Sequence, residues 1–160
     1  MSATFSTQIK ELNDWNEFWP VLRHVAESGE AGLRIVKTFA LDCAERALPA
    51  YEAEYPGDLR VRTAIEVSRR HLRGEATIDE VKTAANAAYA VYAAANTVYA
   101  ADAAACAAYA AADAAADTAY AAACAAAYAA DAAAADAGDN YDAERRWQRA
   151  HLVKLLEAAE

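Results

Sequence analysis

The 160-residue sequence contains few residues that interrupt helices and no pattern that indicates a strand. Glycine occurs five times and proline three times, and neither occurs between Gly74 and Gly138. No alternating run of Val, Ile, Thr and Tyr is bounded by turn residues, as a strand would be. Because alanine is the strongest helix former and dominates the centre of the chain, we expect an all-α protein.

Signals for export and for membrane insertion are also missing. Residues 1–5 do not combine a basic region with an apolar run, so we expect no signal peptide. No stretch of strongly apolar residues is long enough for a span, and the Ala-rich region carries Asp every few residues. Three cysteines, Cys43, Cys106 and Cys124, cannot all pair within one chain. We therefore expect reduced thiols, a cytoplasmic location and no membrane partner.

Basic residues are absent from the middle of the chain. Residues 83–143 contain no Lys, Arg or Glu but seven Asp, and 36 of these 61 residues are Ala. The whole chain has a net charge of −9. This balance argues against direct nucleic-acid binding, which needs a basic surface. It favours a basic protein as the partner, because opposite charges speed the encounter.

The residue patterns of catalytic and metal sites are missing as well. His24, His71 and His151 are far apart, and none has a His or Cys three or four residues away, as paired metal ligands on a helix would. The sequence has no Gly-rich phosphate loop, no G-x-S-x-G and no H-E-x-x-H. We expect a protein that is not an enzyme and that uses neither a metal nor a cofactor.

Turn and capping residues divide the chain into helices. Pro20 fits the first turn of a helix that the Ser28–Glu30 segment then ends. The next helix is expected to begin near Ala31 and to end or kink near Pro49.

Local signals also mark the following boundaries. Tyr55–Asp58 is a turn, in which Asp58 fits the N-cap of the next helix and Gly74 its C-terminal end. Thr77–Glu80 is a capping box that opens the Ala-rich region. The last helix is expected over Tyr141–Ala158.

These boundaries predict one domain, a multi-helix bundle over residues 1–160. It would consist of an N-terminal helical lead (1–30), a helical region (31–82), closely packed Ala-rich acidic helices (83–137) and a C-terminal helix (139–160). A single helix over residues 78–136 would be roughly 90 Å long, whereas a domain of this size is only about 30–40 Å across. The Ala-rich region should therefore fold back, best at Asn96-Thr97 and second best at Asp117-Thr118.

The Ala-rich region carries its other residues at helical spacing. On a helix they form one stripe of Tyr, Asp and Cys along an alanine surface. Its members are Tyr92, Tyr99, Asp102, Cys106, Tyr109, Asp113, Asp117, Tyr120, Cys124, Tyr128 and Asp131.

Three interpretations of this stripe are open. It can be a solvated face, in which Asp supplies solubility. It can be a recognition surface, because Tyr favours interfaces and Asp selects a basic partner. It can be a buried polar seam, which would need every Asp paired. As a recognition surface, its candidate interface residues are Asp102, Tyr109, Asp113, Asp117, Tyr120, Tyr128 and Asp131.

Several motifs outside the stripe resemble a known family. They are C-A-E-R-A-L-P at Cys43–Pro49, Y-E-A-E-Y-P-G-D at Tyr51–Asp58, R-V-R-T-A-I-E at Arg60–Glu66, L-R-G-E at Leu72–Glu75 and E-R-R-W-Q at Glu144–Gln148. In this order, and with the Ala-rich stretch before the last, they resemble the predicted immunity proteins of bacterial polymorphic toxin systems. The resemblance covers roughly residues 33–156. It implies a small, all-helical, cytoplasmic protein that neutralises a toxin encoded nearby.

The sequence leaves three functions open. The first is a toxin-neutralising or effector-inhibiting protein that acts by binding. The second is a phage-type, anti-CRISPR-like inhibitor of a host defence nuclease, in which the Asp residues imitate a phosphate backbone. The third is a self-associating helical module, with a homodimer expected if the stripe is core.

Overall fold

The computed structural model describes Ile9 and residues 15–94, 124–125, 128–129 and 140–159. Its helices are α2 (Trp15–Glu27), α3 (Glu30–Glu54), α4 (Arg60–Leu72), α5 (Ile78–Ala94) and α8 (Asn140–Glu157). No strand occurs among these residues, and the all-α prediction is confirmed. The expected bends at Asn96-Thr97 and Asp117-Thr118 lie outside the described residues.

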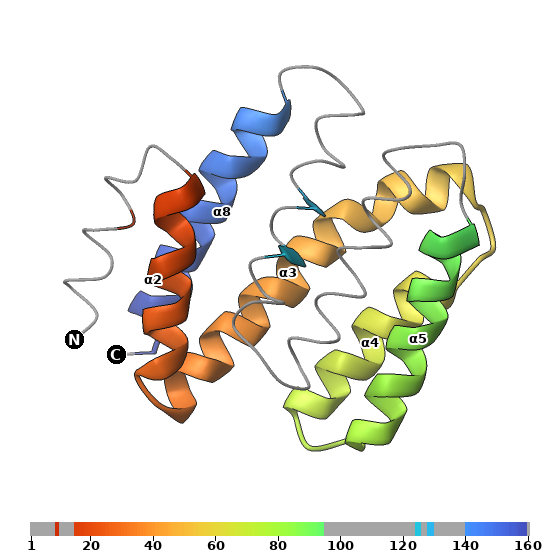
Figure 1. The fold of residues 1–160 in the computed structure, drawn as a ribbon, viewed down its shortest axis with the longest axis horizontal. Helices are drawn as coiled ribbons and strands as arrows, with labels where there is room; N and C mark the ends of the chain where they lie inside the picture. Colours follow the sequence, from red (N-terminus) through yellow and green to blue (C-terminus); the bar gives the residue numbers. More distant parts are fainter. Residues whose placement is uncertain (1–8, 10–14, 95–123, 126–127, 130–139, 160) are drawn as a thin grey trace.

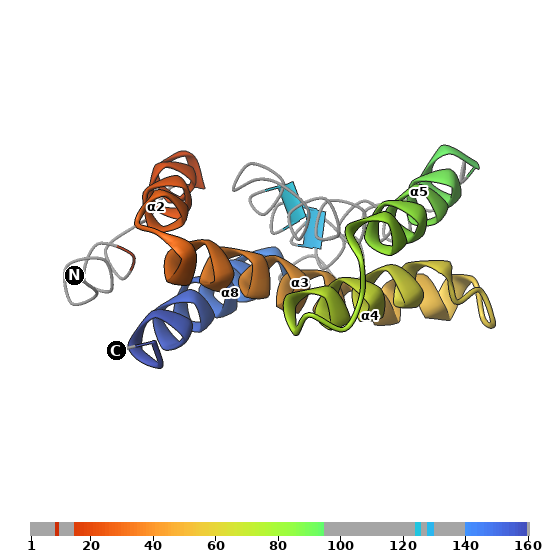
Figure 2. The same ribbon diagram turned by 90° about the horizontal axis from the view of Figure 1, so that it is seen from below.

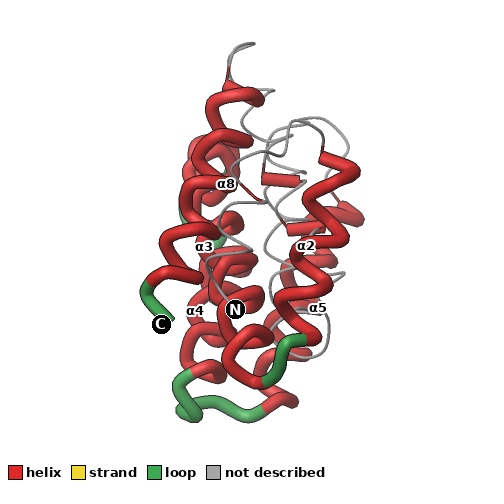
Figure 3. Tube along the Cα trace, turned by 90° about the vertical axis from the view of Figure 1, so that its left-hand side faces the viewer, coloured by secondary structure: helices red, strands yellow, loops and turns green. Residues whose placement is uncertain are grey.

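Helix α3 is the central element of the fold (Figure 1). It contacts α2, α4 and α8, whereas α5 contacts α4 alone among the described helices. Viewed from below, α3, α4 and α8 form one layer, and α2 and α5 lie on the same side of it (Figure 2). The end view shows the same division into two layers (Figure 3).

The main hydrophobic core surrounds α3. Phe39, Leu41 and Tyr51 of α3 are fully buried, together with Leu22 of α2 and Leu152 of α8. Large side chains therefore fill the space where α2 and α8 meet α3.

The α4–α5 pair has a core of smaller side chains, of which the fully buried Val81 packs against the partly buried Ile78. Its buried residues include Ala64 of α4 and Ala84 and Ala88 of α5, with the partly buried Val67 against them. Small side chains let two helices approach closely, and this is the packing that the Ala-rich composition predicts.

Two predicted helix boundaries are confirmed by their hydrogen bonds. Gly74 has a φ of 76°, its N–H donates to the carbonyl of His71, and the N–H of Glu75 donates to the carbonyl of Arg70. This is the Schellman arrangement that a glycine permits after a helix. In the capping box, the Thr77 N–H donates to Oε2 of Glu80 at 2.7 Å, and the Glu80 N–H donates to Oγ1 of Thr77 at 3.2 Å.

The structure corrects two predictions made at proline, the first-turn position of Pro20 and the end of a helix near Pro49, where a kink was the alternative. Helix α2 begins at Trp15, so Pro20 lies inside it rather than in its first turn. Helix α3 continues past Pro49 to Glu54, with Leu48 and Tyr51 buried on either side of the proline. Each proline removes one helical hydrogen bond. Burial of the neighbouring side chains offsets this cost for α3, because it stabilises the continued helix.

The prediction that Asp58 is the N-cap of α4 is wrong by one residue. Leu59 occupies that position, and Oδ1 of Asp58 accepts the backbone N–H of Arg60 at 3.1 Å. The Arg60 guanidinium also donates to both carboxylate oxygens of Asp58. These bonds hold the pKa of Asp58 well below its usual range. The aspartate thus satisfies a helix N–H, as predicted, but from the residue before the cap.

Candidate functional site

Charged and aromatic side chains from three helices meet where α8 crosses α3. We call this group the junction cluster. It consists of Asp42, Glu45 and Arg46 of α3, Arg69 of α4, and Glu144, Trp147, Gln148 and His151 of α8.

Asp42 connects the three helices through one carboxylate. Its Oδ2 lies 2.6 Å from Nε2 of His151 on α8. Its Oδ1 accepts a hydrogen bond from Nη2 of Arg69 on α4 at 2.7 Å. The same Arg69 nitrogen donates to Oε2 of Glu45. The side chains of Asp42, Arg69 and His151 are largely buried, so these contacts are screened less than surface ion pairs are.

A second ion pair lies farther toward the start of α8. Nε of Arg46 donates to Oε2 of Glu144 at 2.9 Å, and Nε2 of Gln148 lies 3.3 Å from Oε1 of the same carboxylate. The Glu144 side chain is only 5% exposed and Gln148 is fully buried. A buried carboxylate is tolerated when it is paired and hydrogen-bonded, and both conditions hold here.

Stacked rings join the two ion pairs. The Arg46 guanidinium lies 4.1 Å from the centroid of the Trp147 ring. Trp147 stacks on His151, with ring centroids 4.6 Å apart and an interplanar angle of 12°. Phe39 lies beyond, 6.5 Å from the His151 ring centroid. The stack fixes the rotation of α8 relative to α3, because the rings of Trp147 and His151 on α8 contact Arg46 and Phe39 on α3.

This arrangement is suited to holding helices together rather than to catalysis. Burial raises the pKa of the Cys43 thiol well above its usual value, so that the thiol is a poor nucleophile. The described contacts of His151 are with Asp42 and with aromatic rings. Across the described ranges, no group of three His, Cys, Asp or Glu residues could hold a metal ion.

Of the predicted interface residues, the structure describes Tyr128, which is 39% exposed. In the same stretch Ala125 and Ala129 are buried, and Cys124 packs against the main core. The alanines and the stripe residue Cys124 therefore lie toward the core here, whereas the stripe residue Tyr128 faces outward. The other candidates, Asp102, Tyr109, Asp113, Asp117, Tyr120 and Asp131, lie outside the described residues, so the interface stays a prediction.

Sequence reasoning singled out only part of the junction cluster. Glu45 and Arg46 lie in the C-A-E-R motif, and Glu144, Trp147 and Gln148 lie in E-R-R-W-Q. Their contact was not predicted, since 98 residues separate Arg46 from Glu144. Asp42, Arg69 and His151 belong to no quoted motif, and their spacing gave no signal.

The fold and the junction cluster define an all-helical protein whose long-range ion pairs join α3, α4 and α8. The family described as "Imm-5 like putative immunity protein" matches residues 29–155. The chain belongs to this family, which confirms the resemblance seen in the motifs and associates the protein with an immunity function. No curated protein and no solved structure matches the chain. Among the described residues, no helix is long and apolar enough to cross a membrane.

Proposed function

We propose that the protein neutralises a toxin by binding it in a one-to-one complex, without any catalytic step of its own. The observation that carries this proposal is the family match, which extends over residues 29–155 and so includes nearly all of α3 through α8. The Cys43 thiol is buried and neutral, and His151 is in contact with Asp42, so both residues are suited to a structural role in a binding protein.

The surface that we assign to this role is the predicted interface of Asp102, Tyr109, Asp113, Asp117, Tyr120, Tyr128 and Asp131. Two facts support the choice. Tyr128 is exposed and lies beside buried alanines. The stretch from residue 83 to 143 has seven Asp and no basic residue of its own to pair with them.

The carboxylates of the junction region differ in this respect. Asp42 and Glu45 pair with Arg69, and Glu144 pairs with Arg46. Their charges are therefore largely neutralised by neighbours. The acidic interface is the better candidate for a basic toxin, because Asp and Tyr together offer both charge and apolar contact.

Binding in the cytoplasm is part of this proposal. Cys43 and Cys124 are free thiols in the structure, as expected for a reducing compartment.

Co-production with the toxin encoded beside the gene tests the proposal. We expect the wild-type chain to restore growth of a bacterial host that makes the toxin. Tyr128→Ala should weaken the rescue, because it removes an exposed interface ring. Tyr89→Ala is the matched control, since Tyr89 is 49% exposed but lies on α5, outside the assigned interface. Continued toxicity with wild-type chain in excess would contradict the proposal.

A further inference from the structure

The outward face of α8 carries a basic hollow. It has a volume of about 370 Å³, and its described lining comes from α8 alone. The lining residues are Arg146, Arg149, Ala150, Val153, Lys154 and Glu157. Their spacing places them along one side of the helix, and at the edge of this side Val153 is buried in the main core with Leu152 and Leu156.

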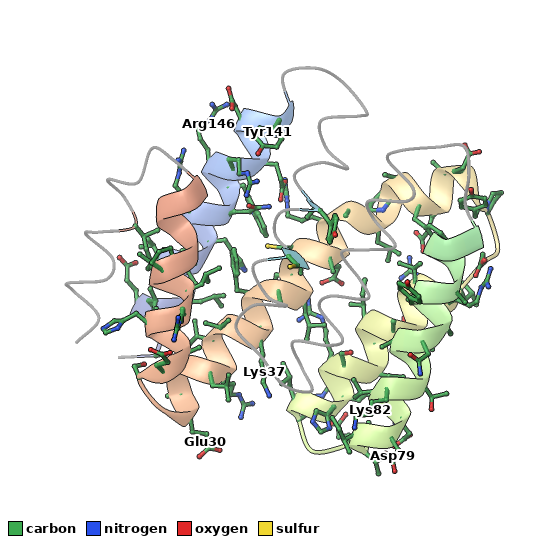
Figure 4. The ribbon with its side chains drawn as sticks, viewed as in Figure 1. Glu30, Lys37, Asp79, Lys82, Tyr141 and Arg146 are labelled. Atoms are coloured by element: carbon green, nitrogen blue, oxygen red, sulfur yellow. The ribbon has the colours of Figure 1, made fainter. Side chains whose placement is uncertain are left out.

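The charge of this hollow is opposite to that of the chain. The chain has a net charge of −9, yet α8 contains four basic and three acidic residues. Arg146 and Lys154 are exposed, and neither has a salt bridge to any described residue. Figure 4 shows Arg146 near the start of α8, next to Tyr141. The hollow is therefore a local basic site on a protein whose overall charge is negative.

The spacing and the floor of the hollow restrict what fits it. Arg146 and Lys154 are eight residues apart, which is about 12 Å along a helix. That separation lets each cation face a different carboxylate of one bound segment. Between the two cations lies the exposed methyl group of Ala150, which can contact an apolar side chain, whereas Val153 is only 5% exposed. A nucleic acid would need a much broader basic surface than three cations on a chain of net negative charge.

We infer that this hollow docks an acidic segment of a partner protein, with carboxylates against Arg146 and Lys154 and an apolar side chain over Ala150. The inference goes beyond the proposed function. It assigns a second surface, of opposite charge to the Tyr/Asp interface, and it does not depend on the identity of the toxin.

Titration of the ¹⁵N-labelled full chain with short poly-L-glutamate tests this inference. The net negative charge of the chain opposes such binding, so any binding must be local. At low salt we expect amide shift changes concentrated in residues 146–157, and we expect high salt to remove them.

Charge reversal supplies the matched comparison. Arg146→Glu with Lys154→Glu should weaken the affinity for poly-L-glutamate by about tenfold or more. Arg34→Glu with Lys82→Glu changes the net charge by the same amount at two other exposed cations, and it should leave residues 146–157 responsive. Lys82 lies at the start of α5, well away from α8 (Figure 4).

Three results would overturn the inference. The first is the absence of shift changes in wild-type protein. The second is an equal loss of affinity in both double variants, which would indicate long-range charge alone. The third is stronger binding of an oligonucleotide than of poly-L-glutamate, which would assign the hollow to nucleic acid. These experiments use no toxin, so their failure is distinct from failure of the proposed function.

Discussion

The contact of α3 with α8 and the contact of α4 with α5 are built from different side chains. Phe39 and Leu152 fill the first, and the ion pairs of Asp42 and Glu144 flank it. Alanines at 64, 84 and 88 form much of the second. A short-range bond joins Arg73 to Glu75 between α4 and α5, whereas Arg62 and Arg69 of α4 pair with residues of α3.

The difference shows two ways of specifying one helical fold. At the α3–α8 contact, polar groups and large rings must match partners far away in sequence, so the register of the helices is fixed by side chains. At the α4–α5 contact, small residues allow close approach of the backbones, and local caps fix where each helix starts and ends. We therefore expect the first contact to fail when side chains are removed and the second to fail when they are enlarged.

The largest effect is expected from Phe39→Ala. It would leave a cavity beside the His151 stack and lower the free energy of unfolding by about 3–5 kcal/mol. Urea unfolding followed by circular dichroism measures this loss. Ile78→Ala in α5 removes a partly buried side chain and should cost below about 2 kcal/mol. Equal losses at the two positions would contradict the comparison.

Enlarging an alanine tests the other contact. Ala88 is fully buried between α5 and α4, so Ala88→Leu should lower the free energy of unfolding by about 1–3 kcal/mol through overpacking. Ala90→Leu places the same side chain at an exposed position of α5 and should change it by less than about 0.5 kcal/mol. Thermal denaturation of both variants gives the comparison. A stabilised Ala88→Leu variant would show that the helices are not closely packed there.

Removing the Arg46 side chain tests the ion pair at the start of α8. Arg46→Ala leaves the buried Glu144 without its guanidinium partner and should cost about 1–3 kcal/mol in the free energy of unfolding. Arg62→Ala is the control, because its pair with Glu52 is more exposed and should contribute below about 1 kcal/mol. A double-mutant cycle with Glu144→Gln separates the pair from the contact of Arg46 with Trp147. A coupling energy of zero would show that the Arg46–Glu144 pair does not stabilise the fold.

The smallest effect is expected at Asp58, at the start of α4. Because Arg60 lowers the pKa of folded Asp58, the ionised carboxylate stabilises the fold above its unfolded pKa of about 3.9 and loses this contribution as pH falls further. Asp58→Asn should therefore cost about 0.5–1 kcal/mol at neutral pH, and the difference from wild type should shrink below about pH 4. Unfolding midpoints measured across this range provide the test. Glu66→Gln, at an exposed position without a described ion pair, is the control for the loss of one negative charge.

The sequence predicted the parts of the fold that depend on neighbouring residues. Gly74 and the Thr77–Glu80 box act within a few residues of themselves, so their roles follow from the chain alone. Pro20 and Pro49 misled the prediction, because a proline signals a helix end locally whereas tertiary burial decides whether the helix continues.

The candidate site was predictable only in pieces. The Arg46–Glu144 pair joins residues 98 apart, and the His151–Asp42 pair joins residues 109 apart. The spacing of residues so far apart in the sequence does not indicate which charged side chain will pair with which. The basic hollow of α8 was missed for a related reason, because its three cations are mixed with acidic residues along the helix.

The central claim is that an acidic Tyr/Asp interface binds a basic toxin. Its most direct test is the affinity of the purified toxin for two charge-matched variants, measured by calorimetry. Asp113→Lys with Asp117→Lys should weaken binding at least about tenfold, which is 1.4 kcal/mol. Glu54→Lys with Glu66→Lys makes the same charge change at exposed positions of α3 and α4 and should bind like wild type. Equal affinity of the two variants would contradict the claim.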